Sequence, residues 1–81
     1  MTINEIKKEI INVMEESTET EVEITEQTHI INDMSLSSVE TMMMISDLED
    51  RFCITIPSSE LRNIRTVEDL CDVIIHVLLT Q

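Results

Sequence analysis

The chain has 81 residues and a formal net charge of −12, from 17 acidic against 5 basic residues. Such a surplus of acid argues against binding a nucleic-acid backbone, which requires clustered lysine and arginine, and against attachment to an anionic membrane surface. A hydrophobic content of 42% with one Phe and no Tyr or Trp predicts one small domain over residues 1–81, with an aliphatic, Met-rich core.

The first helix is expected to begin after Thr2, because Glu5 follows three residues later and completes a capping-box pattern. After Thr2, apolar residues recur at helical spacing: Ile3, Ile6, Ile10, Val13 and Met14. This pattern fades near Ser17. Residues 18–36 show no sustained period and are predicted to form a long loop, which in a small domain is often functional. Its apolar anchors are Val22, Ile24, Ile30, Ile31, Met34 and Leu36.

The second helix is expected to be capped by Ser37, with Glu40 as the capping-box partner, and to run to Phe52. Its apolar stripe is Val39, Met42, Ile45, Leu48 and Phe52, widened by Met43 and Met44. Residues 53–57 alternate between apolar and polar but end at Pro57. We expect them to form an extended linker whose apolar side chains reach the core.

Residues 58–61 are predicted to form one short helical turn. Thr66 then caps the last helix, with Asp69 at the third position. Its stripe is Val67, Leu70, Cys71, Ile74, Ile75 and Leu78. The predicted fold class is therefore all-α, a small four-helix bundle of three longer helices and one short helix, with a long loop between the first two. The predicted core is Ile6, Ile10, Met44, Ile45, Leu48, Phe52, Ile54 and Ile74.

Two cysteines, Cys53 and Cys71, lack C-x-x-C spacing, and we expect both to be buried, reduced core residues. The N-terminal segment reads as an acidic amphipathic helix and not as a signal peptide. The longest apolar run, residues 73–79, is interrupted by His76 and is too short to span a bilayer. These features predict a cytoplasmic protein without membrane insertion.

Catalytic and metal-binding patterns are weak in this chain. It has no G-x-S-x-G motif, and neither His29 nor His76 is tied to a nucleophile by any motif. The absence of glycine argues against a Ca²⁺-binding EF-hand loop. We therefore expect no enzyme activity and no dedicated metal site.

The serines at the start of the second helix differ in their expected roles. Ser35 lies in the loop and Ser37 is used as the cap, so Ser38 occupies the first helical position with its hydroxyl free. A phosphodiester at that hydroxyl would meet unpaired backbone N–H groups and the positive end of the helix dipole. On physical grounds alone, most serines at such positions have no special role.

The surrounding sequence supports a functional role for Ser38. D-M-S-L-S-S-V at residues 33–39 resembles the D-L-G-x-D-S-L signature of acyl carrier proteins. The stretch V-E-T-M-M-M-I-S-D-L-E-D-R-F at 39–52 is similar to the helix that follows in that family, and F-C-I-T-I-P at 52–57 resembles its F-x-I-x-I-P step. T-V-E-D at 66–69 resembles the T-V-x-D entry to its last helix. These blocks align without a gap.

The resemblance implies a carrier and not an enzyme. In that family a phosphopantetheinyl transferase attaches a 4′-phosphopantetheine arm from coenzyme A to the signature serine, which by register is Ser38. Attachment at Ser35 instead would add three residues to the helix before Phe52 and rotate its apolar stripe. Relative to the signature, Ser35 replaces Gly, Ser37 replaces Asp and Val39 replaces Leu, while Met43 stands where many members carry Glu. These departures indicate a divergent member of the family.

The resemblance also implies a partner-binding face on the second helix. Its residues are Ser37, Val39, Glu40, Met42, Asp47, Glu49 and Asp50. Partner synthases and transferases would present lysine and arginine to this acidic face, and we expect the carrier to be a monomer. In some members an acyl chain enters between the helices, which a Met-rich core would accommodate.

Three functions stay open from the sequence. The leading one is an acyl carrier for fatty-acid, lipid or polyketide biosynthesis. A carrier of aminoacyl or peptidyl groups, such as D-alanyl groups, is the near alternative. An unmodified acidic helical adaptor that binds a basic protein belongs to a different class.

Overall fold

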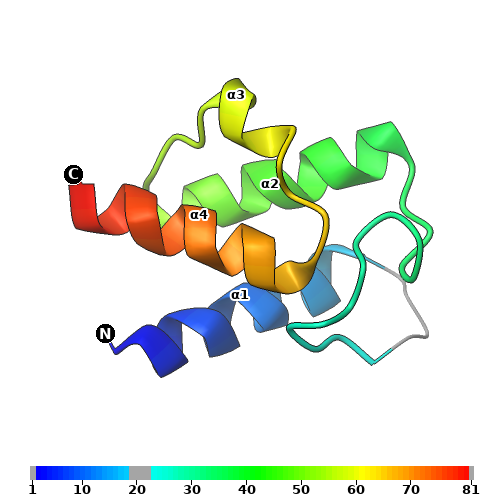
Figure 1. Ribbon diagram of the computed structural model, residues 1–81, viewed down its shortest axis with the longest axis horizontal. Coiled ribbons are helices and arrows are strands. Elements are labelled where there is room, and N and C mark those ends of the chain that lie inside the picture. The colour runs from blue at the N-terminus through cyan, green and yellow to red at the C-terminus, as the bar shows by residue number, and fades with distance from the viewer. Residues whose placement is uncertain (1, 19–22, 81) are drawn as a thin grey trace.

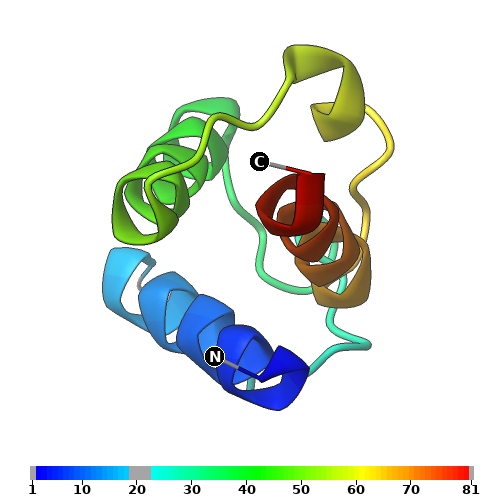
Figure 2. The same cartoon turned by 90° about the vertical axis from the view of Figure 1, so that its left-hand side faces the viewer.

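The computed structural model describes residues 2–18 and 23–80, and these form four helices: α1 (Ile3–Ser17), α2 (Ser38–Phe52), α3 (Ser58–Leu61) and α4 (Val67–Thr80). The three long helices lie side by side, with α1 running opposite to α2 and α4 (Figure 1). Viewed from one end, they form a triangle, and α3 lies above the space between α2 and α4 (Figure 2). The all-α prediction of three longer helices, one short helix and a long first connection is confirmed.

Each long helix begins where the capping pattern predicts. At α1, the Glu5 N–H donates to Thr2 Oγ1 at 3.2 Å, and the Thr2 N–H donates to Glu5 Oε1 at 3.1 Å. At α4, the Asp69 N–H donates to Thr66 Oγ1 at 3.2 Å, and the Thr66 N–H returns a bond to Asp69 Oδ2 at 3.1 Å. These caps satisfy backbone groups that a helix leaves unpaired in its first turn, and each contributes about 1 kcal/mol.

The core is aliphatic and lies where the three long helices meet. Its buried side chains are Ile10, Val13, Met14, Ile24, Ile30, Met34, Leu36, Met44, Ile45, Leu48, Ile54, Ile56, Val67, Leu70, Cys71 and Ile74. Ile6 and Phe52, which we expected inside, are partly buried against it. Ile54 and Ile56 of the extended linker are buried, as predicted.

The apolar stripe of α2 is narrower than its sequence suggests. Met44, Ile45 and Leu48 are buried, but Val39, Met42 and Met43 are 67%, 70% and 60% exposed. The predicted core contains Met44, Ile45 and Leu48 but none of these three exposed residues, although all six belong to the apolar stripe expected from the sequence. Consecutive residues turn by about 100° around a helix, so a run of three methionines cannot point in one direction.

The loop before α2 is fixed to the start of α4. The Ile30 N–H donates to the Arg65 carbonyl at 2.9 Å, and the Val67 N–H donates to the Thr28 carbonyl at 3.0 Å. Four of the predicted apolar anchors in the loop are buried: Ile24, Ile30, Met34 and Leu36. Ile31 is instead 50% exposed, and Val22 lies outside the described residues. The described part of the loop, residues 23–37, therefore packs onto the bundle.

The two cysteines have different environments. Cys71 is buried in the core, and burial raises the pKa of its thiol to about 11, so it is uncharged at neutral pH. Cys53 is exposed, which contradicts the expectation that both are buried. It ends α2 in the left-handed conformation, with φ 54°, and this turn of the chain directs Cys53 to the surface while Ile54 enters the core.

Within the part of the chain that the structure describes, no helix is both long and apolar enough to cross a membrane.

Candidate functional site at the start of helix α2

Ser37 and Ser38 divide two tasks between them at the start of α2. Ser37 is the N-cap: its hydroxyl accepts from the Glu40 N–H at 3.2 Å, and its own N–H donates to Glu40 Oε1 at 3.2 Å. Ser38 is the first helical residue and is exposed. No hydrogen bond found within residues 2–18 and 23–80 uses the Ser38 hydroxyl. The local sequence therefore leaves one serine oxygen free at the positive end of a 15-residue helix.

Ser35 lies in a different setting. It precedes the helix, its backbone has φ 54°, and its N–H donates to the Ile31 carbonyl at 3.0 Å. This left-handed conformation is the one that glycine adopts without steric cost. The turn thus keeps a glycine-like shape although its residue is a serine.

A cavity of about 340 Å³ opens beside Ser38. Its lining is mainly apolar and comes from the loop, from α2, and from α3 and the turn after it: Ile30, Ile31, Ser38, Thr41, Met42, Met44, Ile45, Leu61 and Ile64. The hydroxyls of Ser38 and Thr41 are its polar side-chain groups. Thr41 Oγ1 donates to the Ser37 carbonyl at 2.9 Å, which fixes that hydroxyl against the helix cap.

The lining of this cavity contains no acid or base that would activate Ser38 as a nucleophile. His29 has a structural role in the loop, where its Nδ1 accepts from the Asn32 N–H at 3.3 Å. His76 is exposed on α4. Among the described residues, no three His, Cys, Asp or Glu side chains come close enough together to hold a metal ion. Ser38 therefore presents an exposed hydroxyl, and no residue that lines the adjoining cavity would activate it.

The predicted partner-binding residues do not all have the same freedom. Ser37 and Glu40 are exposed but hydrogen-bonded to each other, whereas the Val39 and Met42 side chains are 67% and 70% exposed. The Glu49 carboxylate is partly buried and accepts from the Ile56 N–H at 2.8 Å, so it fixes the linker after α2.

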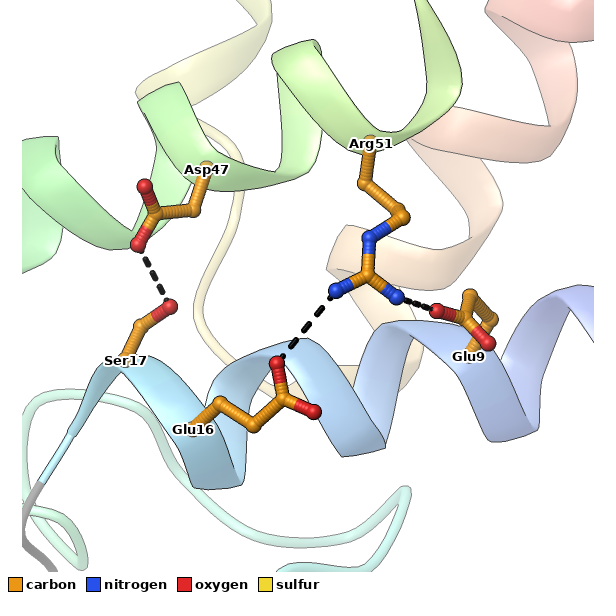
Figure 3. A network of polar contacts seen from close by, with 5 residues as sticks. All are labelled: Glu9, Glu16, Ser17, Asp47 and Arg51. Atoms are coloured by element: carbon orange, nitrogen blue, oxygen red, sulfur yellow. Dashed lines mark hydrogen bonds and ion pairs between the residues drawn. The ribbon is translucent and has the colours of Figure 1, made fainter.

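Asp47 belongs to a polar network between α1 and α2 (Figure 3). Its Oδ2 accepts from the Ser17 hydroxyl at 2.6 Å. One turn further along α2, Arg51 lies between Glu9 and Glu16 of α1 and forms an ion pair with each. Asp50 is exposed next to Arg51 in the sequence. Three of the predicted docking carboxylates, those of Glu40, Asp47 and Glu49, thus already accept intramolecular hydrogen bonds.

Sequence reasoning missed several residues around Ser38. Thr41 follows Ser38 by three positions, and that spacing alone places both on one face of the helix. Leu61 and Ile64 reach the cavity from the other side through the fold, which no local pattern reveals. Ile31 was expected to anchor the loop but is half-exposed at this cavity.

Comparisons with known proteins agree with this geometry. The sequence model of the family described as "Phosphopantetheine attachment site" matches residues 8–74. The chain is 32% identical over 66 residues to an acyl carrier protein of Myxococcus xanthus, covering 82% of this chain and 81% of that protein. It is 32% identical over 66 residues to an acyl carrier protein of Micrococcus luteus, covering 82% and 79%. An acyl carrier protein of Coprothermobacter proteolyticus is 29% identical over 82 residues, covering both chains fully.

Proteins of this family bear phosphopantetheine and act as carriers, not as catalysts. Their modification requires a phosphopantetheinyl transferase, so such an enzyme is a partner of this chain. The family match over most of the sequence, the relatives along its length and the four-helix fold lead to one conclusion: the chain belongs to the acyl carrier protein family.

Proposed function

We propose that Ser38 receives the 4′-phosphopantetheine arm and that residues 1–81 act as one carrier domain. In this reaction the Ser38 oxygen forms a bond to the phosphorus that bears pantetheine in coenzyme A. The pyrophosphate bond breaks, 3′,5′-ADP leaves, and the hydroxyl proton passes to the transferase. The terminal thiol of the arm then holds acyl groups as thioesters.

The single observation that carries this proposal is the free, exposed Ser38 hydroxyl in the first turn of α2. Because Ser37 performs the capping, Ser38 is not needed to hold the helix together. A phosphodiester on Ser38 would lie beside backbone N–H groups of the first turn and at the positive end of the helix dipole. The residues present therefore fit the group.

Carbon-chain cargo is favoured by the cavity beside Ser38. Most of its lining is aliphatic or methionine, and it contains no charged group to pair with an amine. A 150 Å³ apolar cavity holds benzene, so about 340 Å³ would hold at most about a dozen carbon atoms. We propose that the carrier serves fatty-acid, lipid or polyketide biosynthesis and that an acyl chain shelters in this cavity. An aminoacyl or peptidyl group would bring a charged amine against an apolar wall.

The partners proposed for the loaded carrier are acyl-handling synthases and transferases with basic docking patches. The net charge of −12 would draw such patches towards α2, where Glu40 and Asp50 are exposed. The same charge opposes self-association, so we propose a monomer. Its two free cysteines are consistent with a reducing, cytoplasmic setting.

Mass spectrometry after incubation with coenzyme A and a broad-specificity phosphopantetheinyl transferase tests this function. We expect wild-type protein to gain the mass of one arm, Ser35→Ala to gain the same mass, and Ser38→Ala to gain none. Ser35→Ala is the matched control, because it removes a hydroxyl three residues away and leaves the helix cap intact. An arm retained by Ser38→Ala would refute the assignment.

The cargo proposal has a separate test. Arms carrying acyl chains of increasing length are attached, and methyl resonances of Met44 and Ile45 are followed by NMR. Sheltering predicts shifts that grow with chain length and stop growing once the cavity is full. Methyl resonances that stay constant for every chain length would contradict it. Larger shifts with an aminoacyl cargo than with aliphatic ones would favour the aminoacyl carrier instead.

A further inference from the structure

The outer side of α2 bears three large apolar side chains that the core does not use. Val39, Met42 and Met43 are 67%, 70% and 60% exposed, and we call these three residues the apolar shelf. Spacings of three and four residues place them on neighbouring turns of the same side of the helix. Together with Ser46 and Asp47 they line a shallow hollow of about 380 Å³.

The apolar shelf lies beside the modification site. Val39 follows Ser38 directly, and Met42 lines both this hollow and the cavity next to Ser38. A protein that binds at the start of α2 to reach the Ser38 hydroxyl therefore covers part of the shelf. Covering one exposed methionine removes apolar surface worth about 1 to 2 kcal/mol from water, so these contacts are large enough to rank partners.

Charge decides what kind of surface fits on the apolar shelf. A second copy of the chain would bring another net charge of −12 against Glu40 and Asp47, and like charges brought together oppose association. An anionic membrane is repelled for the same reason. The occupant that matches both the apolar centre and the acidic rim is a protein with an apolar depression and lysine or arginine around it.

We propose that Met43 is a specificity-determining residue, which selects partners with an apolar depression opposite it and rejects partners with a lysine or arginine there. A cation buried directly against the Met43 side chain would lose water and meet an uncharged thioether, because the carboxylates of Glu40 and Asp47 belong to the rim of the shelf. The flexible thioether adapts to depressions of different shape, so one carrier can serve several such partners. Because the shelf matters only where Ser38 carries the arm, the inference rests on the proposed function.

Two transferases serve as probes, one whose carrier-binding surface is mainly apolar and one whose surface is mainly basic. The measurement is kcat/KM for arm attachment to wild-type, Met43→Glu, Met43→Leu and Ile3→Glu proteins. Ile3→Glu is the charge control: it adds the same carboxylate at an apolar residue that is 55% exposed. Ile3 is the first residue of α1, and α1 begins at the opposite end of the bundle from the start of α2 (Figure 1). Methionine, leucine and glutamate all favour helices, so the position 43 variants keep α2.

We expect Met43→Glu to shift the ratio of the two kcat/KM values by about tenfold towards the basic transferase. Met43→Leu and Ile3→Glu should keep the wild-type ratio. An unchanged ratio in Met43→Glu, or an equal shift in Ile3→Glu, overturns the role of Met43 and leaves the carrier function standing. Failure of both transferases to modify wild-type protein at Ser38 overturns the carrier function and this inference with it.

Discussion

The turn before α2 allows a prediction about the free energy of unfolding, because the chain has no glycine and a serine adopts the left-handed conformation there. Ser35 has φ 54°, in the left-handed region that costs a residue with a Cβ about 1 to 2 kcal/mol. Glycine adopts this region freely, but it loses about 0.5 to 1 kcal/mol more backbone entropy on folding. Ser35→Gly should therefore raise the free energy of unfolding by about 0.5 to 1 kcal/mol, or the melting temperature by roughly 2 to 8 °C.

Cys53→Gly tests the same reasoning from backbone strain at a second position, because Cys53 also has φ 54° and is exposed at the other end of α2. The 15 residues of the helix separate the two turns by roughly 20 Å, so the gains from Ser35→Gly and Cys53→Gly should add within about 0.5 kcal/mol.

Urea unfolding followed by far-ultraviolet circular dichroism measures these changes. Ser35→Ala is the matched control, since it removes the hydroxyl but keeps the Cβ that crowds the turn. We expect its stability to stay within about 0.5 kcal/mol of wild type. If Ser35→Gly is no more stable than wild type, or if Ser35→Ala gains as much, the reasoning from backbone strain is refuted.

Three further predictions concern the rest of the bundle. Arg51→Gln removes both ion pairs between α1 and α2 and should lower the free energy of unfolding by about 0.5 to 1 kcal/mol at low salt. A loss of stability that does not shrink on going from about 20 mM to about 500 mM salt would contradict this. In native protein a thiol reagent should label Cys53 at once and Cys71 only on unfolding, because Cys71 is buried and burial raises the pKa of its thiol to about 11. Rapid labelling of both cysteines would contradict the burial of Cys71. Backbone N–H groups hold the pKa of Asp69 below its ordinary value of 3.8, so its contribution to stability is present above that pH and is lost as the pH falls through its lower folded value. The stability gap between wild type and Asp69→Asn should therefore narrow from about pH 6 to about pH 3, and a constant gap would contradict the role of Asp69.

Local patterns predicted the helices well because each long helix carries its own start signal. The pairs Thr2–Glu5, Ser37–Glu40 and Thr66–Asp69 all form the expected reciprocal bonds. These interactions span three residues, so they are encoded within a few positions of sequence. The same locality placed Ser38 one residue inside α2, where its hydroxyl is free.

Features that depend on long-range packing were harder to predict. The run Met42–Met43–Met44 is uniformly apolar, and only the position of α1 and α4 around α2 decides that Met44 is buried and Met43 exposed. The exposure of Cys53 follows from a left-handed turn, and the sequence gives no signal of that turn because no glycine occurs there. The cavity beside Ser38 requires the loop and α3 to meet across α2, which no single segment specifies.

Fragmentation of the modified wild-type protein tests the central claim most directly. The protein is loaded with the arm, digested, and the peptide containing Ser35, Ser37 and Ser38 is sequenced by tandem mass spectrometry. We predict that the phosphodiester is found on Ser38 alone. An arm found on Ser35 or Ser37 would contradict the account, because the hydroxyl at the first helical position would then not be the attachment point.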